Sequence, residues 1–400
     1  MRASGADLQG YERAEHALLL GSARLHASPE QASRLARLFA CDLDWSLLLE
    51  LATAHGLRPL LFRHAVAHAA QALPAGVETR LWVHQQQLLS KNRHLAAELS
   101  AILEMFGSNA VPALPFKGPM LALELYGDLG LREFGDLDLL VPASKLRQAT
   151  GLLATRGYAP MFALSPAGES AMLDSPAQYH WMLMRGQGQG LVELHWQTDA
   201  EYPVGRPSEE AWWSGLQRTG FDGRDVPRLA AQEMLLALCL HGSKHHWTSL
   251  HWLADVAELI RQSPALDWRW LLDRADATKS GTRVALALLL ANADLDAPLP
   301  QSVHGWLDGF PRARALCGAI RAGWFRLPPR SSGPFERLRL NMKLYDSGAH
   351  RLRHLVDETC RPGIAEWSRW QLPASLFFIY VPLRMLRLLG KQGARLIGVG

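Results

Sequence analysis

Apolar residues recur every three to four positions over most of the first hundred residues. Segment 43–66 has this spacing, and a second, longer stretch continues it over residues 78–106. The period is typical of helices that bury one face. Gly107 and the polar residues after it end the pattern, as expected at a helix C-terminus. We therefore predict a helical region over residues 1–106.

The pattern then changes to short apolar runs bounded by proline or glycine. These runs predict strands at 111–116, 136–141, 178–184 and 191–196, and helices at 119–126 and 143–155. The last two strands flank the glycine-rich segment 185–190, an arrangement typical of a β-hairpin. From residue 227 onward the helical spacing returns. The predicted fold class is α+β, with a small mixed sheet flanked by helical N-terminal and C-terminal regions.

The predicted organisation has four parts. They are a helical N-terminal region (1–106), an α/β core (107–225), a helical domain packing on the core (226–322) and a basic helical C-terminal region (323–400). Segment 323–334 has the composition of a linker or surface loop. A chain of 400 residues exceeds one ordinary domain, which agrees with this division.

The composition is typical of a folded protein without a membrane-spanning helix. Hydrophobic residues make up 48% and charged residues 20%, a balance typical of a folded chain. No apolar run reaches the roughly 18 residues of a membrane span, and Asp7 and Glu12 precede any long apolar run. The four cysteines are scattered without metal-binding spacing and favour reduced thiols. We expect a cytoplasmic protein.

Charge is distributed unevenly. Residues 311–400 contain fourteen arginines and two lysines against five acidic residues, a net charge of +11, so the first 310 residues carry −7. Segment 376–397 is apolar at first and then basic, with Pro382 expected to begin or kink a helix. Its basic residues Arg384, Arg387, Lys391 and Arg395 are spaced to share one helix face.

This basic C-terminal region predicts contact with an anionic membrane surface or an acidic partner, and hence a peripheral location at a membrane. The alternatives are a helix docked on the protein body and arginines that only solvate helix faces. The region contains no recognisable nucleic-acid motif, which argues against nucleic acid as the partner.

Candidate chemistry concentrates in residues 116–142. Asp136 and Asp138 are two residues apart on a predicted strand and therefore share a face. Adjacent carboxylates repel unless a cation lies between them, and Mg²⁺ or Mn²⁺ prefers such ligands. Glu193 lies within the apolar strand 191–196, where a carboxylate is costly unless it is paired or bound to metal. His195 shares its face; alternatively, both residues form a solvated face.

A phosphate-binding arrangement precedes these acids. Lys117 and Gly118 follow an apolar run and open a helix, where backbone N–H groups and the helix dipole favour an anion. Lys117 adds a charge, and it is one of only seven lysines among 42 basic residues. Arg132 precedes Asp136 by four residues and is a candidate for the same phosphates.

A later predicted helix carries His241, Lys244, His245, His246 and His251. His241 and His245 are four residues apart and share a face. The pair suggests zinc, but neither an HExxH motif nor an evident third ligand accompanies it. The favoured functional interpretation is that Lys244 or His245 contacts a nucleotide or an acceptor; ordinary structural histidines are the alternative. Asp255, four residues after His251, is expected to orient that ring.

The order of these parts resembles the uncharacterised nucleotidyltransferase family of the polymerase beta superfamily. The resemblance spans roughly residues 40–260 and is most specific over 116–196. It implies a metal-dependent transfer of a nucleoside monophosphate from an NTP to a hydroxyl or similar acceptor. By motif position, Asp136 and Asp138 match the metal pair and Glu193 matches the third carboxylate.

One departure from the family pattern keeps an alternative open. The family's usual Gly-Ser lies closer to the DxD motif than Lys117-Gly118 does in this sequence. The alternative is therefore a nucleotide-binding or regulatory protein that keeps the fold without turnover.

Overall fold

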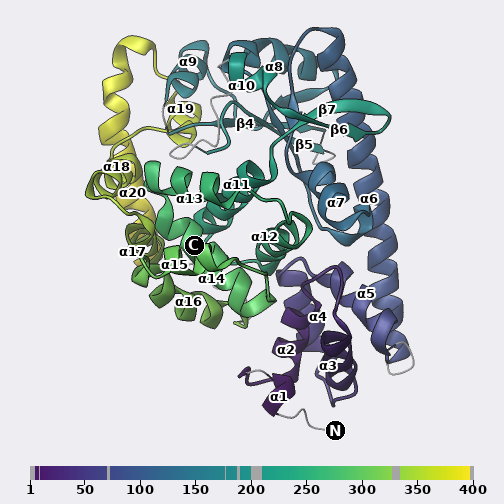
Figure 1. Ribbon diagram of the computed structural model, residues 1–400. Helices are drawn as coiled ribbons and strands as arrows, with labels where there is room; N and C mark the ends of the chain where they lie inside the picture. Colours follow the sequence, from purple (N-terminus) through teal and green to yellow (C-terminus); the bar gives the residue numbers. More distant parts are fainter. Residues whose placement is uncertain are drawn as a thin grey trace.

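A mixed sheet surrounded by helices forms the framework of the molecule (Figure 1). The computed structural model describes residues 5–8, 10–69, 73–175, 177–186, 190–199, 210–326 and 334–396. The five-stranded sheet has the order β1-β2-β5-β4-β3, and β6 and β7 form a separate two-stranded sheet. The predicted α+β class is confirmed.

The strands are β1 Leu114–Pro115, β2 Leu137–Leu140, β3 Tyr158–Pro160, β4 His180–Arg185, β5 Gly190–His195, β6 Gln217–Phe221 and β7 Arg224–Arg228. β2 and β5 are parallel, and every other neighbouring pair is antiparallel. The β4–β5 pair is the hairpin predicted from the glycine-rich turn.

Helices precede and interrupt the sheet. The N-terminal helices are α1 Gly5–Leu8, α2 Ala14–Ser22, α3 Pro29–Phe39, α4 Trp45–Ala54, α5 Arg58–Ala69 and α6 Ala75–Ser108. Those of the sheet region are α7 Gly118–Tyr126, η2 Leu129–Leu131, η3 Ala143–Lys145, α8 Leu146–Thr155, α9 Pro166–Asp174 and α10 Glu210–Ser214.

The rest of the chain is helical in its described part. After β7 follow α11 Ala231–Lys244, α12 Leu250–Gln262, α13 Trp268–Ala277, α14 Gly281–Leu295, α15 Gln301–Leu307 and α16 Pro311–Trp324. The last elements are α17 Pro334–Leu344, α18 Gly348–Thr359, α19 Ile364–Trp370, η4 Ala374–Ile379 and α20 Tyr380–Leu396. Most of the predicted loop 323–334 lies outside the described residues.

Four strands differ from the sequence-based expectation: β1 is shorter than predicted, and β3, β6 and β7 were not predicted. The strand predicted at 111–116 is reduced to β1, because prolines at 112 and 115 cannot donate ladder hydrogen bonds. The β6–β7 hairpin was not predicted, since its exposed residues lack a clear apolar alternation. Its turn nevertheless carried a signal: Asp222 and Gly223 both have positive φ, the Asp-Gly combination favoured in two-residue hairpin turns.

Two hydrophobic cores hold the elements together, and α6 contributes to both. Its first turns place Val77 and Leu81 in a core with the N-terminal helices and α11–α16. Its last turns place Leu99 and Phe106 in a second core with the sheet and α8. Trp367 of α19 also belongs to this second core. In Figure 1, α6 accordingly runs along one side of the molecule, from the N-terminal helices up to the sheet.

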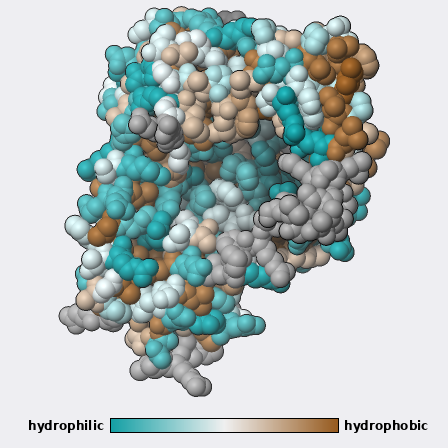
Figure 2. All heavy atoms as spheres, turned by 180° about the vertical axis from the view of Figure 1, so that it is seen from behind, coloured by the Kyte–Doolittle hydropathy of each residue, from teal (hydrophilic) through white to brown (hydrophobic). Residues whose placement is uncertain are grey.

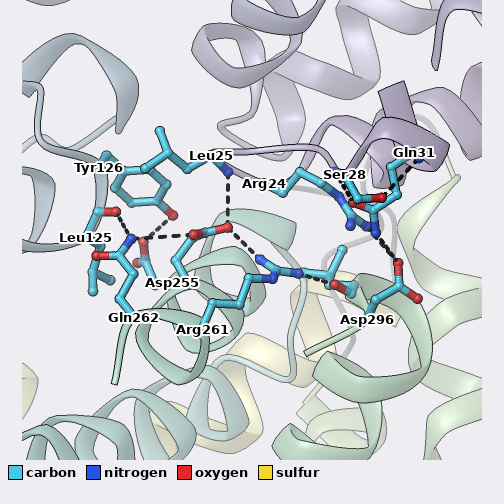
Figure 3. A network of polar contacts seen from close by, with 12 residues as sticks. Arg24, Leu25, Ser28, Gln31, Leu125, Tyr126, Asp255, Arg261, Gln262 and Asp296 are labelled. Atoms are coloured by element: carbon cyan, nitrogen blue, oxygen red, sulfur yellow. Dashed lines mark hydrogen bonds and ion pairs between the residues drawn. The ribbon is translucent and has the colours of Figure 1, made fainter. Parts of the chain in front are cut away.

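A polar network joins the N-terminal helices to α12 and α14 (Figure 3). The Arg24 guanidinium donates to Asp296 at 3.0 Å, and the Leu25 amide donates to the buried Glu258 carboxylate at 3.0 Å. On the same side of α12, the Tyr126 hydroxyl donates to Asp255 at 2.9 Å. Buried carboxylates need such donors, so Glu258 fixes α12 against the N-terminal region and Asp255 fixes it against α7.

The C-terminal helices differ from expectation in where their charges point. α20 begins at Tyr380 with Pro382 in its first turn, as predicted. Arg384 and Arg387 do not form an outward basic face, because both bind the fully buried Glu366. The side chains of Lys391 and Arg395 lie outside those described. No helix among the described residues is long and apolar enough to span a bilayer.

Candidate functional site

A cavity of about 590 Å³ lies between the sheet and helices α11 and α12. Every residue predicted for the site lines this cavity: Lys117, Gly118, Arg132, Asp136, Asp138, Glu193, Lys244 and His245. Figure 2 shows a hollow with a largely hydrophilic lining in the middle of the face seen there. Tertiary folding thus gathers side chains that are spread over more than a hundred positions.

The centre of the cavity is set by the register of β2 and β5. In this parallel pair, Asp138 lies beside Glu193 and Leu140 beside His195. His195 Nε2 is 3.1 Å from Asp138 Oδ1 and 3.4 Å from Glu193 Oε2. Ligand atoms of these three side chains all lie within 4.8 Å of one another. The alternative of a solvated Glu193–His195 face is therefore wrong, since His195 is buried and both residues face the cavity.

Asp136 lies just before β2 and lines the same cavity, but it is not part of that close cluster. Burial raises its pKa to about 6, with further increases from the negative charges of Asp138 and Glu193. The carboxylate repulsion expected from the sequence is thus concentrated on Asp136.

Asp138 and Glu193 show the opposite behaviour. Burial alone would raise the pKa of Asp138, but Lys117, His195 and His241 outweigh it and lower that pKa. Burial likewise opposes the charge of Glu193, and the hydrogen bond with His195 is the main interaction that lowers its pKa. Both carboxylates are therefore ionised at neutral pH, which a cation ligand requires.

Lys117 reaches the centre of the site from the N-terminus of α7. Its Nζ donates to Asp138 Oδ1 at 3.2 Å and lies 3.4 Å from His241 Nδ1. The ammonium also lies 5.0 Å from the centre of the Phe116 ring. Lys117 thus holds a positive charge directly beside the carboxylate cluster.

Gly118 allows this close approach. Its φ of +54° is in the left-handed region, and a Cβ atom there would lie 3.1 Å from the carbonyl oxygen of Asp136. A side chain would be strained in both respects. The glycine brings the start of α7 against the segment that carries the two aspartates, as the predicted strand–turn–helix arrangement requires.

Arg132 lines the cavity, but its guanidinium is engaged elsewhere. Its Nε lies 3.1 Å from both carboxylate oxygens of Asp255, and one terminal nitrogen donates to Asp255 at 2.9 Å. Both side chains are buried, at 7% and 0% exposure. Asp255 therefore binds Arg132 and Tyr126, and its contacts among the described residues do not orient His251. The contact of Arg132 with phosphates stays a prediction, for a side chain that lines the cavity while Asp255 holds its guanidinium.

Helix α11 forms the wall opposite the sheet. Lys244 donates a hydrogen bond to the Tyr179 hydroxyl, and its Nζ lies 4.7 Å from the centre of that ring. Burial lowers the pKa of His245 to about 4 and that of His241 well below its usual value. The zinc interpretation gains no support, because the metal-ligand cluster found among the described residues does not include either histidine.

Sequence reasoning missed several residues of the cavity. Lys91 on α6 lines it together with Lys117 and Lys244, so three of the chain's seven lysines meet there. Tyr179 and His180 also line it. Strand alternation was the available signal for His180, because it pairs with His195 across β4 and β5. No local pattern could have pointed to Lys91, which occupies an ordinary position in a long helix.

Comparison with known proteins establishes the family. The model of the uncharacterised nucleotidyltransferase family matches residues 42–296, so the chain belongs to this family. No curated protein and no solved structure matches the chain. The matched range contains the whole cavity lining and ends before α15, which leaves the C-terminal helices outside it.

Proposed function

We propose that the protein is a metal-dependent nucleotidyltransferase that moves a nucleoside monophosphate from an NTP to a hydroxyl or similar acceptor. The observation that carries this proposal is the close cluster of Asp138, Glu193 and His195 in a cavity that also holds three lysines. Family membership supports nucleotidyl transfer as the general reaction.

The donor set fits a divalent cation. Two carboxylates suit Mg²⁺ or Mn²⁺, and the imidazole of His195 is also compatible with Mn²⁺. Asp138 and Glu193 would hold the ion with His195, and Asp136 would complete the set from the cavity wall. When bound, the cation would supply positive charge to the phosphates and to the leaving pyrophosphate.

The chain's own side chains supply the remaining functions. Lys117, at the start of α7, and Lys244, on α11, bring two ammonium groups to the cavity, where they bind and orient an NTP's phosphates. Asp136, which lines the cavity beside the cluster, is the carboxylate that would take the proton from the acceptor hydroxyl. His245 contributes a neutral imidazole to the same wall.

A second cavity of about 400 Å³ is a candidate for the acceptor. It shares Tyr179, His180, Asp199 and Lys244 with the first cavity. Its far wall comes from the C-terminal helices, including Asn341 and Glu358. An acceptor bound there lies next to the NTP and contacts residues outside the range matched by the family.

Pyrophosphate release tests the proposal. We expect release from at least one NTP with Mg²⁺ or Mn²⁺ when small molecules from a cell extract serve as acceptors. Glu358→Trp fills the second cavity and is expected to reduce acceptor-dependent release while leaving NTP affinity unchanged. NTP binding without release under all conditions would instead support the regulatory alternative.

Lys117→Ala tests the phosphate contact. We expect NTP affinity to fall by on the order of 1.5–3 kcal/mol, as for the loss of a charge-assisted hydrogen bond. Isothermal titration calorimetry measures this change. Lys145→Ala is the matched control. Among the described contacts, the Lys145 ammonium donates a hydrogen bond to Gln148 at an exposed position, away from the cavity lining. If Lys117→Ala leaves NTP affinity unchanged, Lys117 does not bind the phosphates, and Lys244 or His245 becomes the candidate phosphate ligand.

A further inference from the structure

The C-terminal helices expose unusually large apolar side chains. The three most exposed large apolar residues in the described part of the chain are Phe378, Leu386 and Leu352, at 71%, 64% and 63%. Four more on the same helices are also exposed: Leu355, Val356, Leu376 and Met385. We refer to these seven residues, on α18, η4 and α20, as the C-terminal apolar face.

The elements that carry this face are fixed to one another. η4 leads directly into α20, and α18 packs against α20. The Arg384 guanidinium of α20 donates to the carbonyl oxygen of Glu358 on α18 at 2.8 Å and to Glu366 on α19 at 3.1 Å. In Figure 2, apolar atoms form a band at the upper right, the edge where the C-terminal helices lie in the reversed view of Figure 1.

The described side chains of α20 have arginines on the inner side and apolar residues on the outer side, the reverse of an ordinary surface helix. Arg384 and Arg387 point inward, at 13% and 15% exposure, onto the fully buried Glu366. The apolar residues Met385 and Leu386 point outward, at 44% and 64%. Since burial of a Leu side chain is favourable by about 1.5–3 kcal/mol, this arrangement indicates a surface that is covered during function.

The charge of the region identifies the covering partner. Residues 336–388 contain nine arginines and lysines against five acidic residues. Five of the basic residues are exposed on the C-terminal helices: Arg353 on α18, which carries part of the face, and Arg337, Arg339, Lys343 and Arg369 on the neighbouring helices α17 and α19. Apolar side chains that enter the headgroup boundary, flanked by cations that meet anionic headgroups, are the combination by which proteins bind an anionic bilayer.

We propose that the C-terminal apolar face docks the protein on an anionic membrane surface. The docking is peripheral, because Phe378, Leu386 and Leu352 project from folded helices and no described helix could span the bilayer. This proposal does not depend on the proposed reaction, since the face lies outside the family match and outside the lining of the first cavity.

Vesicle flotation with the full chain tests this proposal. We expect the protein to float with vesicles of equimolar phosphatidylglycerol and phosphatidylcholine and to remain below with phosphatidylcholine alone. The double variant Phe378→Ser, Leu386→Ser is expected to lose affinity at least about tenfold, because two anchors are removed. Both side chains are exposed, so circular dichroism should show an unchanged fold.

A matched control uses an apolar site elsewhere on the surface. Trp82 and Val83 on α6 are 54% and 39% exposed, and the double variant Trp82→Ser, Val83→Ser should bind anionic vesicles like the wild type. Equal recovery with both vesicle types, or unchanged binding of the Phe378/Leu386 variant, would overturn the proposal. So would concentration-dependent dimerisation without vesicle binding, which would make the face an interface between copies of the chain.

Discussion

Asp138→Asn is expected to abolish both pyrophosphate release and the rise in melting temperature caused by Mg²⁺ or Mn²⁺. The substitution keeps the side-chain shape but removes the charge that a bound cation needs. A ligand that binds only the folded site stabilises it, so loss of the site removes that stabilisation. Thermal melts with and without each ion, combined with pyrophosphate release, measure the two effects.

The metal-free stability of this variant distinguishes two pictures of the site. The repulsion expected from the sequence predicts that Asp138→Asn stabilises the metal-free protein. The structure indicates the opposite for Asp138, whose pKa Lys117 and His195 lower despite its burial. We therefore expect Asp138→Asn to destabilise the metal-free protein, since Lys117 loses its ionic partner.

Asp136→Asn is the matched control, for which we expect the opposite change in the stability of the metal-free protein. Burial and the neighbouring carboxylates raise the pKa of Asp136 from 3.8 to about 6, so the folded state disfavours its charge. Between these values the folded protein binds more protons than the unfolded chain, and stability falls as pH rises. Asp136→Asn should remove this decline and stabilise the metal-free protein at pH 7 by on the order of 1–3 kcal/mol. Equal effects of the two substitutions would contradict this assignment.

Arg132→Ala is expected to destabilise the fold severely. It removes one partner of a buried, doubly hydrogen-bonded ion pair and leaves the carboxylate of Asp255 without its cation. Breaking such a pair costs about 3–5 kcal/mol, a large share of the stability of a typical domain. Urea unfolding followed by circular dichroism measures the loss.

An exposed ion pair provides the comparison. Arg218 and Asp225 pair at 2.8 Å with side chains 54% and 68% exposed, so Arg218→Ala should cost less than about 1 kcal/mol. The sequence-based hypothesis predicts a different result for Arg132→Ala: unchanged stability with weaker NTP binding. That outcome would restore Arg132 as a phosphate ligand and would show that Asp255 finds another partner.

The local features of the site could be predicted from the sequence. Asp136 and Asp138 share a face because side chains alternate along a strand, and an acid at position 193 in an apolar strand implies a polar environment. The helix start at Gly118 followed from glycine and proline chemistry over a few residues. Each of these inferences depends on neighbours along the chain, for which spacing alone fixes the geometry.

The choice of ionic partners depended on the tertiary structure. Lys117 pairs with Asp138, and Arg384 pairs with Glu366. Arg132 pairs with Asp255, which lies 123 positions further along the chain. A long basic side chain can reach many carboxylates, and the packing of distant segments decides which one is buried beside it. The parallel register of β2 and β5 likewise placed His195 against Asp138, a contact between residues 57 positions apart.

The sequence by itself determined most of the helical and strand segments and most of the acids of the candidate site, because these follow from local periodicity. Only the tertiary structure decided which charges are neutralised in the interior and which apolar side chains of the C-terminal helices remain exposed, because burial is a property of the packed chain.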